Sequence, residues 1–192
     1  MPLFSDRKSA APDHMPPPSL PLLALELRAP WEFAAVLPAW PVLQRAPLGD
    51  GHTVIVFPGL TAGDTTTLPL RRYLESRNYN TLGWGQGLNL GPREGVLENA
   101  KAQLQQAADA SGNKVSLVGW SLGGIYAREL AKEMPDLVRC VVTLGTPFAG
   151  PHTSTNAWRI YQFASGRSIE RETENYNLPE APPVPTTSIY SR

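Results

Sequence analysis

The sequence has little of several features that would mark particular classes of protein. Cys140 is its only cysteine, so no disulfide can form within the chain, and its apolar neighbours predict a small buried core residue. Basic and acidic residues number 17 each, which leaves no net charge and no basic stripe for nucleic acid. No apolar run reaches the roughly 18 residues of a transmembrane helix, and the N-terminus lacks the ordered regions of a signal peptide. We therefore predict a cytoplasmic protein without a transmembrane segment or a nucleic-acid partner.

Prolines divide the chain into regions of different character. Residues 1–50 contain ten of the 20 prolines, and residues 1–18 have almost no apolar periodicity, so we predict a mobile tail there. Residues 20–43 are apolar enough for short helical pieces laid against a core, with prolines preventing one long helix. The chain length suits one core, and we predict a single domain over residues 19–192.

From residue 51 onward, short apolar runs alternate with amphipathic segments. The runs at 115–119 and 138–145 are too continuously apolar for a half-exposed sheet. Strands that are buried on both faces and separated by helices predict a parallel α/β sheet, with its chemistry at the carboxyl ends of the strands. Asp64 or a following threonine is expected to cap the first helix. The predicted strands are 53–57, 79–83, 115–119, 138–145 and 186–190, and the predicted helices are 68–77 and 93–108.

One serine stands at the tightest of these connections. The segment GWSLG, residues 119–123, has the form G-x-S-x-G, follows a predicted strand and precedes a predicted helix. Small residues on either side let strand and helix approach closely, which forces Ser121 into a strained conformation and exposes its hydroxyl. We predict that Ser121 is a nucleophile and that the turn requires Gly119 and Gly123. The alternative is a glycine-rich connection with an incidental serine.

A second turn is expected to complete an anion-binding site beside Ser121. The segment VFPGL, residues 56–60, ends an earlier strand, and Gly59 lets the backbone turn inward. The N–H of Leu60 can then pair with that of Leu122, at the N-terminus of the helix, to hold an oxyanion. An ordinary Pro-Gly turn is the alternative.

At this point the chain resembles the α/β-hydrolase fold, and more narrowly the bacterial triacylglycerol lipases and esterases within it. The resemblance covers roughly residues 20–192. It implies a mostly parallel sheet with helices on both faces, and hydrolysis of a small-molecule or lipid ester through an acyl-serine, without metal or organic cofactor. The segments that carry it are VIVFPGL (54–60), WGQGLNLGP (84–92), VSLVGWSLGGIYARELA (115–131) and TLGTPFAGP (143–151).

Other residues are assigned to the pocket with alternatives left open. Trp120 and Phe148 are expected either to line an acyl pocket or to pack under the elbow, and His152 to lie on the pocket rim. Asn89 is expected to tie down its glycine-rich loop rather than touch substrate. Residues 151–182 form either a lid over the pocket, as insertions in this fold do, or a helix packed on the sheet.

The base and the acid that would activate Ser121 are missing from this pattern. In the resembled fold they follow the serine in the order acid, then histidine. His14 lies in the predicted tail, His52 precedes the first strand at its wrong end, and His152 follows with no acid properly placed before it. In this family the acid comes just after a strand such as 186–190, where the chain stops. We therefore expect a hydrolase that is incomplete at its C-terminal end.

Two classes of function remain open at this stage. The first is an ester hydrolase that is impaired because its acid and base are absent, and the second is a non-catalytic fragment or binding module. An acyltransferase or a polyester depolymerase would present the same elbow. In either class, strand 186–190 would be an uncovered sheet edge, through which we expect self-association.

Overall fold

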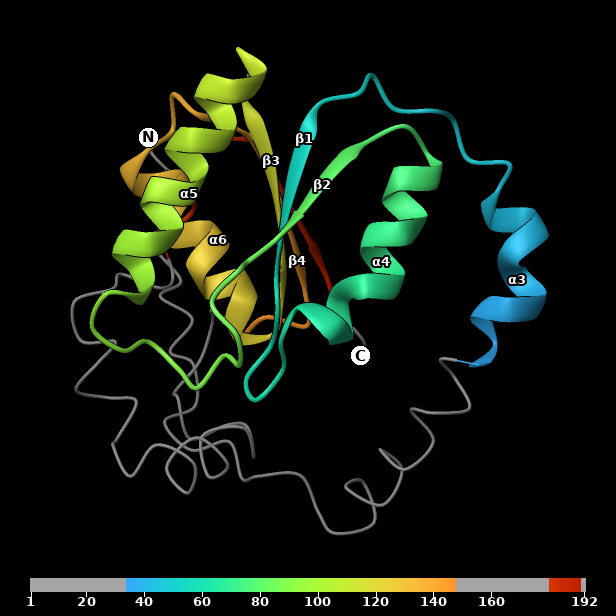
Figure 1. Cartoon of the computed structure of the whole chain (residues 1–192), viewed down its shortest axis with the longest axis horizontal. Coiled ribbons are helices and arrows are strands. Elements are labelled where there is room, and N and C mark those ends of the chain that lie inside the picture. Colours follow the sequence, from blue (N-terminus) through green and yellow to red (C-terminus); the bar gives the residue numbers. More distant parts are fainter. Residues whose placement is uncertain (1–33, 148–179, 191–192) are drawn as a thin grey trace, which may run out of the picture.

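A five-stranded sheet with all strands parallel forms the centre of the computed structural model, which describes residues 34–147 and 180–190 (Figure 1). The order across the sheet is β2-β1-β3-β4-β5, as expected for a chain that alternates strands and helices. The strands are β1 (Thr53–Phe57), β2 (Asn80–Gly83), β3 (Val115–Trp120), β4 (Val138–Leu144) and β5 (Thr186–Ile189). The predicted parallel α/β sheet is confirmed.

Helices cover both faces of the sheet. In Figure 1, α5 and α6 lie on one side of the sheet, α4 lies on the other, and α3 lies beyond α4. This arrangement buries the apolar strands on two sides, which explains why their sequences show no alternation. The helices are α3 (Val36–Leu43), α4 (Asp64–Ser76), α5 (Val96–Ser111) and α6 (Leu122–Glu133).

The core lies between the sheet and the pair α5 and α6. Ile55, Leu117 and Val141 of the three central strands are fully buried there, and each such aliphatic side chain contributes about 1.5–3 kcal/mol on burial. Helix α5 contributes an apolar stripe to this core, and all of the following members are buried: Val96, Leu97, Ala100, Leu104 and Ala107.

Helix α3 departs from the expectation for the proline-rich region. The helical piece forms, but none of its residues is buried, so it is not laid against the core. It packs instead on α4, where the Trp40 and Tyr73 rings meet edge to face at 5.9 Å. The Tyr73 hydroxyl also donates to the carbonyl oxygen of Leu43 at 3.1 Å. The prediction of a short helix is therefore confirmed, whereas the prediction that it packs on the core is wrong, because it packs on α4.

Several predictions concern residues that the structure does not describe. They are the tail at 1–18, the helical pieces expected between residues 20 and 33, the lid at 151–182 apart from its last three residues, and the pocket residues Phe148 and His152.

Candidate active site

The turn that joins β3 to α6 has an unusual backbone. Ser121 has φ 50° and ψ −120°, a region that non-glycine residues rarely adopt and that costs about 1–3 kcal/mol. Its N–H donates to the carbonyl oxygen of Leu144 at 2.8 Å, and its own carbonyl accepts from Gly124 at 3.0 Å. The strained turn thus holds the half-buried Ser121 beyond the carboxyl end of β3.

The glycines around Ser121 are required by close backbone contacts. A Cβ at Gly119 would lie 2.3 Å from the Cα of Gly124, and a Cβ at Gly123 would lie 2.3 Å from the carbonyl oxygen of Phe57. Both contacts are with backbone atoms, which cannot move aside as a flexible side chain would. Strand, turn and helix can therefore approach this closely only where neither position has a side chain.

The turn after β1 lies against Ser121. A Cβ at Gly59 would be only 3.4 Å from the Cβ of Ser121 and from the ring of Trp120. Leu60, the next residue, packs its side chain on the core. Leu122 is the first residue of α6, and the first amides of a helix have no acceptor within the helix. The two segments that carry the predicted amides thus meet at the serine, while their role in binding an oxyanion stays a prediction.

Asn89 ties this turn to the loop that follows β2. Its side chain is fully buried, and Nδ2 donates to the carbonyl oxygen of Pro58 at 2.8 Å. Its Oδ1 accepts from the N–H of Gly91 at 3.1 Å and from the hydroxyl of Tyr126 at 3.3 Å. The Asn89 N–H donates to the carbonyl oxygen of Ala62 at 2.8 Å, and the Asn89 carbonyl oxygen accepts from the N–H of Thr61 at 2.7 Å. The expectation that Asn89 ties down its loop is confirmed, and the bond to Pro58 extends that role to the turn beside Ser121.

Asp64 has a structural role that the sequence did not reveal. It is not the N-cap of α4, which is Gly63. The alternative of a following threonine is correct, because Thr66 Oγ1 accepts from the Gly63 N–H at 3.3 Å and donates to the Gly63 carbonyl oxygen at 2.6 Å. The Asp64 carboxylate accepts from the N–H of Trp84 at 2.9 Å and from that of Gly85 at 3.1 Å. Asp64 therefore fixes the start of the loop after β2. These partners lie 20 residues further along the chain, so no local pattern indicated them.

Trp120 lies at the carboxyl edge of the sheet and is 47% exposed. Gly119 faces α6, so the alternation of side chains along β3 turns Trp120 to the opposite face. On that face it is accompanied by the half-buried Leu144 of β4 and by Ile189 of β5, which is 56% exposed. An apolar surface thus borders the turn at Ser121. The expectation that Trp120 lines an acyl pocket stays a prediction.

The glutamates of α6 and the one histidine within residues 34–147 and 180–190 are paired with groups other than Ser121. Glu129 pairs with Lys132 at 2.6 Å, and Glu133 pairs with Lys101. His52 bonds to the hydroxyl of Ser116, five residues of extended strand before Ser121, or about 16 Å away. Within residues 34–147 and 180–190, no group of three His, Cys, Asp or Glu side chains could hold a metal ion.

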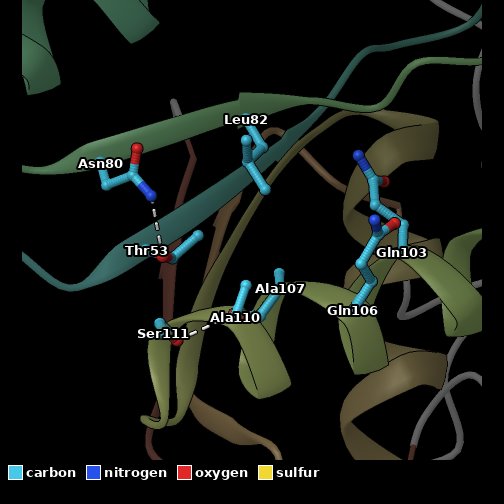
Figure 2. Close-up of a pocket in the computed structure, with 8 residues that line it drawn as sticks. All are labelled: Thr53, Asn80, Leu82, Gln103, Gln106, Ala107, Ala110 and Ser111. Atoms are coloured by element: carbon cyan, nitrogen blue, oxygen red, sulfur yellow. Dashed lines mark hydrogen bonds between the residues drawn. The ribbon is translucent and has the colours of Figure 1, made fainter.

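A groove of about 390 Å³ lies between α5 and the strands β1 and β2 (Figure 2). Asn80 Nδ2 donates to Thr53 Oγ1 at 3.1 Å at one end of it, and Gln103 Nε2 donates to the carbonyl oxygen of Gly83 at 2.6 Å. The groove holds no charged side chain and no nucleophile placed against a base. The groove extends from Thr53 and Asn80, which begin their strands, to Leu82 near the end of β2, and its lining does not include Ser121. Its lining comprises Thr53, Asn80, Leu82, Gln103, Gln106, Ala107, Ala110 and Ser111.

Comparison with known proteins agrees with this architecture. Residues 33–166 match the family model of the alpha/beta hydrolase fold, and the chain belongs to that family. It is 30% identical over 125 residues to Serine hydrolase BPHL of Mus musculus, an alignment that covers 60% of this chain and 42% of the mouse protein. It is 32% identical over 104 residues to Polyketide synthase ThaQ of Burkholderia thailandensis, with 51% of this chain and 5% of that protein covered.

Among solved structures, the fold is similar to that of Aspergillus fumigatus lipase B. The TM-score is 0.54 at 21% identity, and the match covers 76% of this chain and 39% of the lipase. This chain thus spans about two fifths of the length of the mouse hydrolase and of the fungal lipase. In the part that the structure describes, no helix is both long and apolar enough to cross a membrane.

Proposed function

We propose that this protein is a carboxylic ester hydrolase of the lipase and esterase type, with Ser121 as its nucleophile. The observation that carries the proposal is the φ of 50° at Ser121, between a parallel strand and a helix N-terminus, with the turn at Gly59 against it. Membership of the alpha/beta hydrolase family supports a hydrolase. The names of the relatives, a serine hydrolase and a lipase, support serine chemistry on an ester.

The proposed reaction has two steps. Ser121 Oγ attacks the ester carbonyl carbon, its proton passes to a base, and the alcohol leaves with a proton. The Leu60 and Leu122 amides stabilise the negative charge that develops on the carbonyl oxygen. Water then cleaves the acyl-serine and releases the acid. The substrate is a small-molecule or lipid ester, whose apolar part we place against Trp120.

Among the described residues, no histidine lies beside Ser121 to act as its base, because His52 is bonded to Ser116 and Asp50. Ser116, to which His52 bonds, lies about 16 Å before Ser121 along β3, and we assign no proton transfer to His152. In a serine protease, loss of triad members leaves about 10³–10⁴-fold acceleration over water from the oxyanion hole and binding. We therefore expect this chain to cleave an activated short-chain aryl ester only slowly and a triglyceride not at all. His152→Ala should change that slow rate little.

A serine-directed fluorophosphonate tests the nucleophile separately from turnover. We expect the probe to modify Ser121, and we expect Ser121→Ala to lose this modification while keeping the same circular dichroism spectrum. A folded wild-type chain whose Ser121 stays unmodified would favour the second candidate, a binding module without turnover. The observation behind that candidate is that His52, the one histidine within residues 34–147 and 180–190, lies at the other end of the sheet.

A further inference from the structure

A second arrangement of serine, histidine and aspartate lies at the opposite end of the sheet from Ser121. His52, just before β1, has Nε2 at 2.7 Å from Ser116 Oγ in β3. Its other ring nitrogen, Nδ1, bonds to Asp50 Oδ1. Arg139 of β4 donates to Asp50 Oδ2 at 2.6 Å. Residues from three separate parts of the chain thus form one connected line, in which the imidazole lies between a hydroxyl and a carboxylate.

The chemistry of these groups decides where the protons lie. An ionised carboxylate can only accept, so His52 Nδ1 carries the proton that it donates to Asp50. The Arg139 guanidinium also lies 3.1 Å from Nδ1, but the contact with the carboxylate is the shorter one. In the neutral imidazole, Nε2 is then the acceptor, to which the Ser116 hydroxyl donates. Bonds from His52 and Arg139 hold the pKa of Asp50 well below its usual range, so the carboxylate stays ionised.

The pairing of β3 with β4 is irregular beside this cluster. Val115 pairs with Val138 but Ser116 pairs with Cys140, so Arg139 is an extra residue in β4. A bulge of this kind redirects a side chain, and here the side chain of Arg139 reaches Asp50. Tyr79 of the segment before β2 packs edge to face on His52 at a ring separation of 5.1 Å. The Tyr79 ring and the bonds to Asp50 and Ser116 therefore fix the orientation of the imidazole.

Exposure falls steadily along the line. The Asp50 side chain is 54% exposed, that of His52 is 12% exposed, and Ser116 as a residue is 5% exposed. Cys140, half-buried, lies beside the serine with Sγ 3.3 Å from its Oγ. A hydroxyl in this position is shielded from bulky reagents, so the proposal below concerns small ones. Ser116 also lies inside a strand, without the free helical amides that follow Ser121, so charge on an attacked oxygen has no comparable stabilisation.

We propose that Ser116 is a second activated serine, a site of stoichiometric modification by small acylating or phosphonylating electrophiles. With a fluorophosphonate, Ser116 Oγ forms a bond to phosphorus and the phosphorus–fluorine bond breaks. The hydroxyl proton passes to His52 Nε2 and then to solvent, while fluoride leaves. The Asp50 carboxylate stabilises the imidazolium in between. Because the oxyanion is poorly stabilised, the adduct forms slowly and is not turned over.

The experiment uses the full chain and a small dialkyl fluorophosphonate, with Ser121→Ala as the background. Trypsin releases Ser116 and Ser121 in one peptide, between Lys114 and Arg128, so fragment ions must assign the modified serine. We expect Ser121→Ala to become modified at Ser116, up to one equivalent and more slowly than wild type at Ser121. Adding His52→Gln should slow this by at least tenfold, as loss of a general base does. Asp50→Asn should slow it as well.

Matched controls separate this site from a purely structural cluster and from the function proposed for Ser121. Ser188 Oγ accepts from the Thr143 hydroxyl at 3.0 Å and has no imidazole partner in the described residues, so Ser188→Ala should change nothing. A folded Ser121→Ala chain with no adduct at Ser116 would overturn the proposal, as would an adduct rate that His52→Gln leaves unchanged. Neither result decides whether Ser121 is a nucleophile, because labelling of Ser121 is measured independently in the wild-type chain. Conversely, Ser116 can react even if Ser121 does not.

Discussion

Ser121 is held in a conformation that its own side chain disfavours, and the residues around it supply the constraint. Gly119 and Gly123 leave no room for a Cβ against the neighbouring backbone, and Leu144 accepts the Ser121 N–H. Strain of this kind persists only where the surroundings over-determine it. At the residue scale, the reactivity of the serine should therefore depend on positions that never touch a substrate.

Gly123→Ala tests this dependence. The new methyl group would lie 2.3 Å from the Phe57 carbonyl oxygen, and forcing the backbones apart should cost about 2–3 kcal/mol of unfolding free energy. The rate at which a fluorophosphonate modifies Ser121 should also fall in this variant. Gly112→Ala is the control: its φ of 64° costs about 1–2 kcal/mol, but the site has open space around it. Chemical denaturation and labelling of both variants decide the matter, and equal labelling in the two would argue against a strained, closely packed elbow.

Asn89→Ala should act on Ser121 through the turn beside it. The substitution leaves the Pro58 carbonyl oxygen without its donor, and an unsatisfied buried group costs about 1–3 kcal/mol. We expect the labelling rate of Ser121 to fall several-fold, because the turn that carries Leu60 is no longer fixed. Asn113→Ala is the matched control, since its side chain bonds only within an exposed turn. Unchanged stability and labelling in Asn89→Ala would contradict the positioning role.

At the scale of elements, the sequence predicted strands well and their side-chain partners poorly. The bounds of β1 agree with its apolar run, because a buried parallel strand has a continuous apolar sequence. Helix α4 begins four residues before the predicted start at 68, because its first turn, from Asp64 to Thr67, is polar and has no apolar periodicity.

The elbow at Ser121 could be predicted because its requirements are local, within residues 119–123. The bond from Asn89 to Pro58 spans 31 positions, and that from His52 to Ser116 spans 64. Such pairs are set by how the strands are ordered across the sheet, which the spacing of residues in one segment does not encode.

Asp50 and His52, which connect the segment before β1 to strands β3 and β4, predict how the stability of the fold depends on pH. The pKa of Asp50 is held well below its usual range by His52 and Arg139, so its contribution to stability is present in full above the unfolded pKa of about 4. It is lost as the pH falls from there through the lower folded value. Asp50→Asn should therefore lower Tm near neutral pH, and the difference from wild type should shrink as the pH falls below about 4. A difference that instead grows as the pH falls would contradict the assigned bonds.

At the scale of the whole molecule, β5 has a partner on one side only among the described residues. It pairs with β4, and Ile189 and Tyr190 at its end are 56% and 68% exposed. An unpaired edge with apolar neighbours is a template for association between chains. We expect the chain to self-associate as its concentration rises, which sedimentation velocity measures.

A charge placed at that edge should prevent the association. Ile189→Lys should shift the chain toward the monomer, whereas Val42→Lys should not, although Val42 on α3 is exposed to a similar degree, at 65%. A wild-type chain that stays a monodisperse monomer at all concentrations would show that this edge is not an interaction surface.

The central claim is that Ser121 is the nucleophile of an ester hydrolase. Its most direct test is to incubate the chain with an activated short-chain aryl ester and locate the acyl group by mass spectrometry. The account predicts slow release of the aryl alcohol with an acyl group on Ser121, and no acyl group at that position in a folded Ser121→Ala variant. An unmodified Ser121 together with an equal rate of ester cleavage in Ser121→Ala would contradict it.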